Sequence, residues 1–266
     1  MKLKSRFLPA IALLGTLALG ACEKVEQDSM SPALEQRTIA QVYTEANQVT
    51  AYSFSSQLIA RVNHFNKKTG KPETYETFER DAEGKLLKVS TQAAMNDALL
   101  SEEVYTYTKD GQLQETTTVY YDGNKVEYSI LTTYSYNQDK SLNRKSVFEG
   151  TGDEAQLKSY TTYKSMPNGN YTQEQLYAVD DKGKAKLFST TSYAYDTNHN
   201  PLYEVVSPGT LSSHNNLISA STTVHGTGKT YTYTYTYKYD AAGYPIHKTV
   251  INPDGSSEVY TFIYRN

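Results

Sequence analysis

The chain has 266 residues, a net charge of −3 at pH 7, one cysteine and no tryptophan, and its 25 tyrosines far outnumber its 7 phenylalanines. The acidic balance argues against a nucleic-acid partner, because phosphate binding requires a basic face. The single cysteine excludes an intramolecular disulfide and a cysteine-based metal cluster. Tyrosine must therefore supply much of the hydrophobic area of any core.

The N-terminus has the layout of an export signal. Lys2, Lys4 and Arg6 precede an apolar run that is too short for a comfortable bilayer-spanning helix. The run ends in Leu19-Gly20-Ala21-Cys22, which resembles the lipobox of bacterial lipoproteins. That resemblance implies that residues 1–21 are a signal peptide and that Cys22 is acylated, so we expect an exported protein held to the membrane by a lipid.

The next segment is polar. We expect residues 22–50 to form a tether, with a possible short helix, and residues 51–266 to form a single β domain. A second mature residue of Glu23 rather than Asp is compatible with sorting to the outer membrane. The periplasmic and the cell-surface face both remain open.

Turn signals recur along the rest of the chain about every 14 residues, for example "DAEG", "DKGK" and "PDGS". The segments between them are rich in Tyr, Thr and Val with period-two alternation, most clearly in residues 231–239. Two wider gaps indicate hidden turns at residues 96–99 and 207–216. Because the connections are too short for parallel crossovers, the sequence predicts an antiparallel up-and-down meander of about 15 strands.

A sheet of this size usually closes or curls, because closure removes exposed edges. The sequence leaves open a closed porin-like barrel and a strongly curled single-layer sheet. A membrane-spanning barrel is less favoured, since the tyrosines run along whole strands instead of gathering into girdles at two membrane interfaces.

An aromatic residue, a polar turn and then Leu, Ile or Pro form a recurring landmark, as in Tyr107-"TKDGQL" and Tyr239-"DAAGYPI". The pattern resembles the tyrosine-aspartate repeats of large bacterial shell and wall-associated proteins. With the lipobox and the Asn215-Asn216 pair, residues 55–266 are more similar to Gram-negative secreted lipoproteins of unknown function with a porin-like β fold. This resemblance implies an architecture and no established chemistry.

No catalytic motif is found. The "GTGKT" stretch lacks the leading glycine of a phosphate-binding loop and precedes a strand instead of a helix. The five histidines have no metal-site spacing, so we nominate no metal ligand, cofactor or catalytic residue. We therefore expect a non-enzymatic binding or scaffold module; the alternative is an envelope hydrolase with a carboxylate site in the barrel lumen.

Two features are candidates for binding, with a carbohydrate or a peptide as the ligand. One is the tyrosine face of the 231–239 strand. The other is the insertion at residues 207–228, which either binds ligand or only covers the sheet. The candidate residues are Tyr231, Tyr233, Tyr235, Tyr237, His214, Asn215 and Asn216. The sequence does not indicate an oligomeric state.

Overall fold

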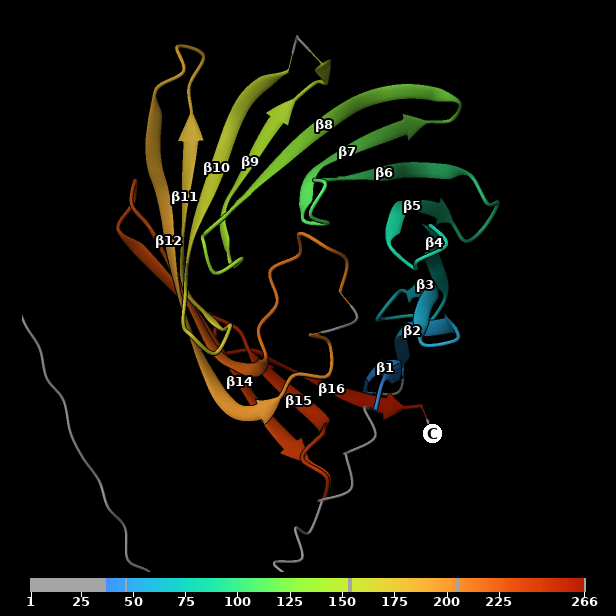
Figure 1. Ribbon diagram of the computed structural model, residues 1–266. Coiled ribbons are helices and arrows are strands. Elements are labelled where there is room, and N and C mark those ends of the chain that lie inside the picture. Colours follow the sequence, from blue (N-terminus) through green and yellow to red (C-terminus); the bar gives the residue numbers. More distant parts are fainter. Residues whose placement is uncertain (1–36, 46, 153–154, 204–205, 266) are drawn as a thin grey trace, which may run out of the picture. The chain divides into compact units, whose positions relative to one another are not determined.

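The computed structural model describes residues 37–45, 47–152, 155–203 and 206–265, which form a closed barrel of antiparallel strands (Figure 1). The strands are β1 (Ile39–Thr44), β2 (Asn47–Ser55), β3 (Leu58–Phe65), β4 (Pro72–Arg80), β5 (Leu86–Ala93), β6 (Leu99–Tyr107), β7 (Leu113–Asp122), β8 (Lys125–Tyr136), β9 (Leu142–Glu149), β10 (Gln156–Ser165), β11 (Tyr171–Val179), β12 (Ala185–His199), β13 (Asn215–Val224), β14 (Lys229–Tyr239), β15 (Pro245–Ile251) and β16 (Ser257–Tyr264).

Each strand pairs with its neighbours in the sequence, and β1 pairs with β16 to close the ring. The predicted all-β antiparallel meander is therefore confirmed, and the barrel is closed instead of being a curled open sheet. The predicted hidden turns are also present, since the chain reverses between β5 and β6 and again between β12 and β13.

The expected boundary at residue 51 is wrong, and so is a tether or helix as far as residue 50. Residues 39–44 form β1, and residues 47–50 begin β2. Ile39 and Val42 are buried in the wall that β1 shares with β16. The short "IAQVYT" pattern does not by itself distinguish a strand from a helix. It forms a strand here because its backbone pairs with β16 and with β2, which leaves no sheet edge exposed. Cys22 and the proposed signal peptide lie outside the described residues.

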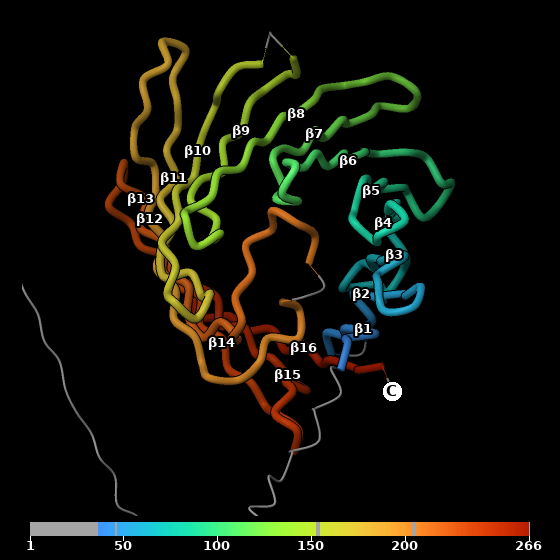
Figure 2. The backbone as a smooth tube through the Cα atoms, in the orientation of Figure 1, coloured from blue at the N-terminus to red at the C-terminus, as the bar shows by residue number. Residues whose placement is uncertain are grey.

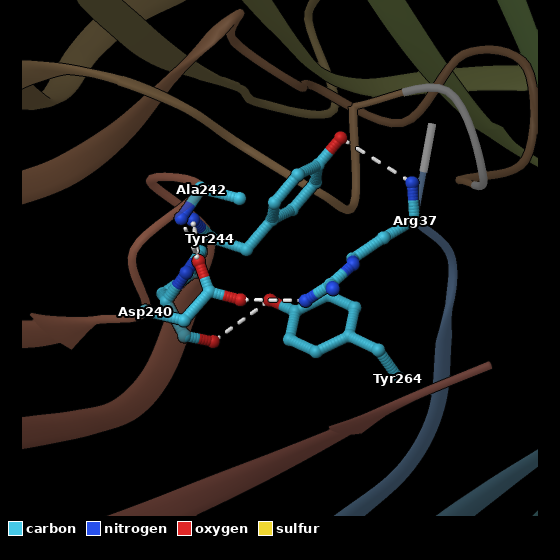
Figure 3. Close-up of polar contacts among 6 residues, drawn as sticks. Arg37, Asp240, Ala242, Tyr244 and Tyr264 are labelled. Atoms are coloured by element: carbon cyan, nitrogen blue, oxygen red, sulfur yellow. Dashed lines mark hydrogen bonds and ion pairs between the residues drawn. The ribbon is translucent and has the colours of Figure 1, made fainter. Parts of the chain in front are cut away.

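The two ends of the barrel differ. We call the end that carries the turns after even-numbered strands the base, and the opposite end the mouth. The β14–β15 turn shows how a base turn is built: the Asp240 carboxylate accepts the N–H groups of Ala242 (2.9 Å) and Tyr244 (3.0 Å), as Figure 3 shows. Gly243 has a φ of +83°, which glycine adopts without strain.

The base contains the best-packed part of the barrel. Leu86, Leu113, Leu142 and Pro245 each follow a base turn directly and are buried. Tyrosines at the ends of even-numbered strands donate across the hairpins to backbone carbonyls. These bonds are Tyr107 to Leu86 O (2.7 Å), Tyr195 to Tyr171 O (2.8 Å) and Tyr264 to Pro245 O (2.7 Å). The aromatic–turn–aliphatic landmark is thus one structural unit, repeated around the base.

The seam between the first and last strands is held by the same turn. The Arg37 guanidinium lies 2.7 Å from the Asp240 carboxylate, and the Arg37 N–H donates to the Tyr244 hydroxyl (3.3 Å) (Figure 3). The ring of Tyr244 also packs edge-on against Tyr264, with ring centres 5.5 Å apart. A residue just before β1 and a turn 203 residues later therefore meet at the point of closure.

The ladder registers separate an inner wall from an outer wall. Tyr105 pairs with Thr116 and Thr116 with Thr132, and Tyr134 lies two residues further along the same face. Tyr134 contacts a segment inside the ring of strands, as described below, so this face is the inner wall. The opposite face mixes polar and apolar residues. Its polar members include Lys88, Ser90, Arg144, Ser146, Thr232, Thr234, Thr236 and Lys238, and its apolar members include Val104, Leu131, Phe148, Val259 and Ile263.

Outward-facing Thr, Lys and Glu side chains therefore share this wall with the exposed side chains of Val104, Val259 and Ile263. Separately, no helix in the described part of the chain is long and apolar enough to cross a membrane.

Candidate binding site in the barrel lumen

The connection between β12 and β13 folds into the lumen. In Figures 1 and 2 its orange trace lies within the ring of strands. We call its described parts, residues 200–203 and 206–214, the lumenal segment. Gly209 packs against the ring of Tyr134 so closely that an added Cβ would lie 2.7 Å from the ring atoms. The Ser207 side chain reaches the hydroxyl of Tyr105. The segment therefore rests on the inner wall at β6 and β8.

The lumenal segment is pinned at the base by polar contacts. Asn200 donates its side-chain N–H to Ser213 O (2.9 Å), and the Ser213 hydroxyl donates to the Tyr195 hydroxyl (2.9 Å). The ring of His214 lies over that of Tyr203, with centres 3.9 Å apart and planes tilted by 32°. A pocket of about 320 Å³ opens between the segment and β11. It is lined by Tyr171, Tyr203, Val206, Ser207, Pro208, Gly209, Thr210 and Ser212.

The asparagine pair is used by the fold. Asn216 is only 4% exposed, and its side-chain amide donates to His199 O (3.1 Å) and, more weakly, to Asn198 O (3.4 Å). Asn215 accepts from the Asn170 amide (2.8 Å) and donates to Asn198 O (3.1 Å). These amides therefore hold the two ends of the segment together. The sequence analysis suggested Asn215 and Asn216 as ligand contacts. In the structure, both side-chain amides are hydrogen-bonded to other residues of the protein.

The tyrosine face of β14 points into the lumen, but its rings have different environments. Tyr231 and Tyr233, near the mouth, are 43% and 40% exposed. Tyr235 is half-buried, and its ring lies under the Lys248 ammonium at 4.8 Å. Tyr237 donates its hydroxyl to Leu217 O (2.9 Å), and burial raises its pKa. Solvent can therefore reach the rings at the mouth, while the rings toward the base support the wall.

Carboxylates beside tyrosines are a feature of the inner wall that the sequence analysis missed. The hydroxyls of Tyr105 and Tyr260 each donate to a glutamate two residues earlier on the same strand, Glu103 and Glu258, at 2.6 Å. Glu174 faces Tyr163 across the β10–β11 ladder. The Glu-x-Tyr spacing within a strand was the available signal, because residues two apart in a strand share a face.

The resolved carboxyl shifts do not favour acid catalysis. The Lys67 ammonium, 2.6 Å away, and the Tyr260 hydroxyl hold the pKa of Glu258 below its usual range. Hydrogen bonds from Ser141 and Ser256 likewise lower the pKa values of Asp139 and Asp254. A general acid at neutral pH needs the opposite shift. Among the described residues, no group of three or more His, Cys, Asp or Glu side chains could hold a metal ion.

Comparison with known proteins gave structural matches only. No protein-family model and no curated protein matches the sequence. A crystal structure of a porin-like protein from Bacteroides vulgatus ATCC 8482 is similar, with 13% identity, a TM-score of 0.54, and coverage of 86% of this chain and 99% of that one.

Two further solved structures also match. A porin-like protein from Bacteroides uniformis ATCC 8492 has 14% identity, a TM-score of 0.46, and coverage of 85% and 96% of the two chains. A protein of unknown function from Bacteroides fragilis NCTC 9343 has 19% identity, a TM-score of 0.33, and coverage of 46% and 92%. At this level of identity, the first likeness shows a shared fold alone: the chain is a closed antiparallel barrel similar in structure to that porin-like protein.

Proposed function

We propose that this protein is a non-enzymatic, carbohydrate-binding lipoprotein of the cell envelope whose ligand enters the barrel lumen from the mouth. The observation that carries the proposal is the tyrosine-lined inner wall, on which Tyr231 and Tyr233 remain accessible. Sugar rings stack on aromatic faces, while phenol hydroxyls and carboxylates can bond the sugar hydroxyls.

The inner wall suits a sugar better than an extended peptide. A peptide that binds to a sheet usually adds a strand at an open edge, and the closed ring leaves no strand edge unpaired. Glu103 and Glu258 already orient neighbouring tyrosine hydroxyls, and such fixed polar groups provide specificity in a site lined by rings.

The envelope location rests on the lipobox and on the likeness to porin-like proteins. The signal peptide and the lipid on Cys22 are part of the proposal, with the membrane as the partner of the anchor.

A hydrolase with carboxylates in the lumen is the second candidate, and we favour it less. Of the inner-wall glutamates, Glu258 has its pKa lowered by Lys67 and Tyr260, which suits a fixed anion and opposes proton donation.

A glycan array with the full-length protein in detergent micelles tests the proposal. We expect glycan binding that Tyr231→Ala and Tyr233→Ala each weaken by roughly 2- to 12-fold, the worth of one aromatic contact. Neither ring makes a hydrogen bond within the described residues, so both variants should keep their thermal stability. Tyr177→Ala is the control, because Tyr177 pairs with Tyr160 on the outer wall. Absence of any glycan ligand, or cleavage of a bound glycan, would contradict the proposal.

A further inference from the structure

The inner wall carries lysines as well as glutamates. Tyr134 of the inner wall pairs with Lys145 of β9, so Lys145 lies on the same face. On the other side of the barrel, Tyr233 and Tyr237 of β14 share the same face, and Tyr237 pairs with Lys248 of β15. Both ammonium groups lie over tyrosine rings: Lys145 is 6.0 Å from the ring centre of Tyr134, and Lys248 is 4.8 Å from that of Tyr235.

Lys248 lies among tyrosines of the two neighbouring strands. Tyr235 and Tyr237 approach it from β14, and Tyr260 is its ladder partner on β16. The lysine is partly buried, and this burial lowers its pKa. On β16, the nearest charged residue that faces the lumen is Glu258. It lies two residues before Tyr260, on the side of the mouth.

The charges of the inner wall are not balanced by one another. Within the described residues, neither Lys145 nor Lys248 has a carboxylate within 4.0 Å. Glu258 is instead occupied by Lys67 (2.6 Å) and the Tyr260 hydroxyl (2.6 Å), and Glu103 by Tyr105 (2.6 Å). Within the described residues, the inner-wall carboxylates Glu103 and Glu174 also lack a cation within 4.0 Å, so the unpaired positive charge is a local feature of Lys248 and Lys145.

An unpaired ammonium in a partly buried site is costly, and an anion that reaches it relieves that cost. A charge-assisted hydrogen bond from lysine to a carboxylate is about twice as strong as a neutral one. The neighbouring tyrosine faces would receive the ring that carries the anion. The Lys248 ammonium and the tyrosine rings around it thus match an anionic sugar better than a neutral one.

We propose that Lys248, with Tyr235, Tyr237 and Tyr260, forms a subsite for the carboxylate-bearing sugar of an acidic glycan. The inference deepens the proposed carbohydrate-binding function and rests on it. Lys145 would add a second, weaker attraction for the same charge from the opposite side of the lumen.

Titration calorimetry with tetragalacturonate and its fully methyl-esterified form tests this subsite, because esterification removes the charge and keeps the sugar rings. We expect the acid form to bind at least tenfold more tightly than the ester. Lys248→Gln should abolish that preference. Lys238→Gln is the matched control, since Lys238 lies on the adjacent strand with its exposed side chain on the outer wall. It should behave as wild type.

A second variant, Lys248→Met, keeps the apolar stem and guards against a folding defect in the glutamine variant. Equal affinity for the acid and the ester in the wild-type protein, or an unchanged preference in both Lys248 variants, would overturn the subsite and leave the carbohydrate-binding proposal intact. If neither form binds and the glycan array is also blank, both proposals fail together.

Discussion

Asn216 forms hydrogen bonds that stabilise the fold at the point where the chain leaves the lumen. Its backbone N–H donates to Asp196 (3.1 Å), and its side chain reaches the carbonyls of residues before the lumenal segment. Tyr239 donates its hydroxyl to the same Asp196 carboxylate, and burial first, then this contact, raises the pKa of Tyr239. A network of this kind is stabilising only while every member has a partner.

Replacing Asn216 with alanine should therefore lower stability without touching a ligand. The change leaves buried carbonyls without donors, which costs roughly 1–3 kcal/mol. Thermal denaturation should show a Tm lower by roughly 2–4 °C for each kcal/mol. The exposed Asn124, in the β7–β8 turn, provides the control variant Asn124→Ala, which should be neutral. Loss of glycan binding in Asn216→Ala with an unchanged Tm would instead make Asn216 a ligand contact.

At the scale of elements, the lumenal segment is a connection at the base that turns inward. Base turns elsewhere are tight, as in residues 240–244, whereas this one continues from residue 200 to 214 and rests on β6 and β8. Gly209 makes the contact with Tyr134 possible, because a side chain there would overlap the ring. The segment narrows the lumen at the base and so leaves the mouth as the entrance.

Gly209→Ala should push the lumenal segment away from Tyr134. The comparison variant is Gly228→Ala: Gly209 and Gly228 both have positive φ (+80° and +66°), so both alanines bear similar backbone strain, but only Gly209 has atoms within 4 Å of the added Cβ. Acrylamide quenching of tyrosine fluorescence should increase in Gly209→Ala and remain at the wild-type level in Gly228→Ala. Equal quenching in the two variants would show that the contact does not hold the segment.

The whole barrel is stabilised by neutral tyrosines. Burial raises the pKa values of many of them, to about 12 for Tyr136 and Tyr260. A group whose pKa is higher in the folded state gives stability that is complete below its unfolded pKa, near 10 for tyrosine, and that is lost as the pH rises through the folded value. The folded barrel then retains protons that the unfolded chain releases, so high pH favours unfolding.

The tyrosine contribution to stability should therefore be constant from neutral pH to about 10 and decline steadily above it. Chemical denaturation at a series of pH values measures this decline, and the ultraviolet absorbance of phenolate counts the ionised rings. We expect the buried rings to ionise together with unfolding. Ionisation of all the tyrosines in a single step near pH 10, with the fold intact, would contradict this picture.

The sequence predicted some features of the candidate site, such as its tyrosine face, but not the exposure or the hydrogen bonds of individual side chains. The alternation of residues 231–239 correctly placed five tyrosines on one face of a strand. It could not show that Tyr237 bonds Leu217 while Tyr231 stays exposed, because exposure depends on the distance from the base. The asparagine pair was noticed for its polarity, but only folding reveals that its amides are already bonded.

The sequence by itself determined the local structure of this protein, since period-two alternation and turn signals about every 14 residues specify hairpins whatever their surroundings. Only the tertiary structure decided closure, because the pairing of β1 with β16 joins residues more than 200 positions apart, and β1 is too short to be recognised alone. The same holds for the lumen: register around the ring determines which side chains face inward. Lys248 and Lys238 look alike in the sequence, and only their places in the ladder separate an inner-wall lysine from an outer one.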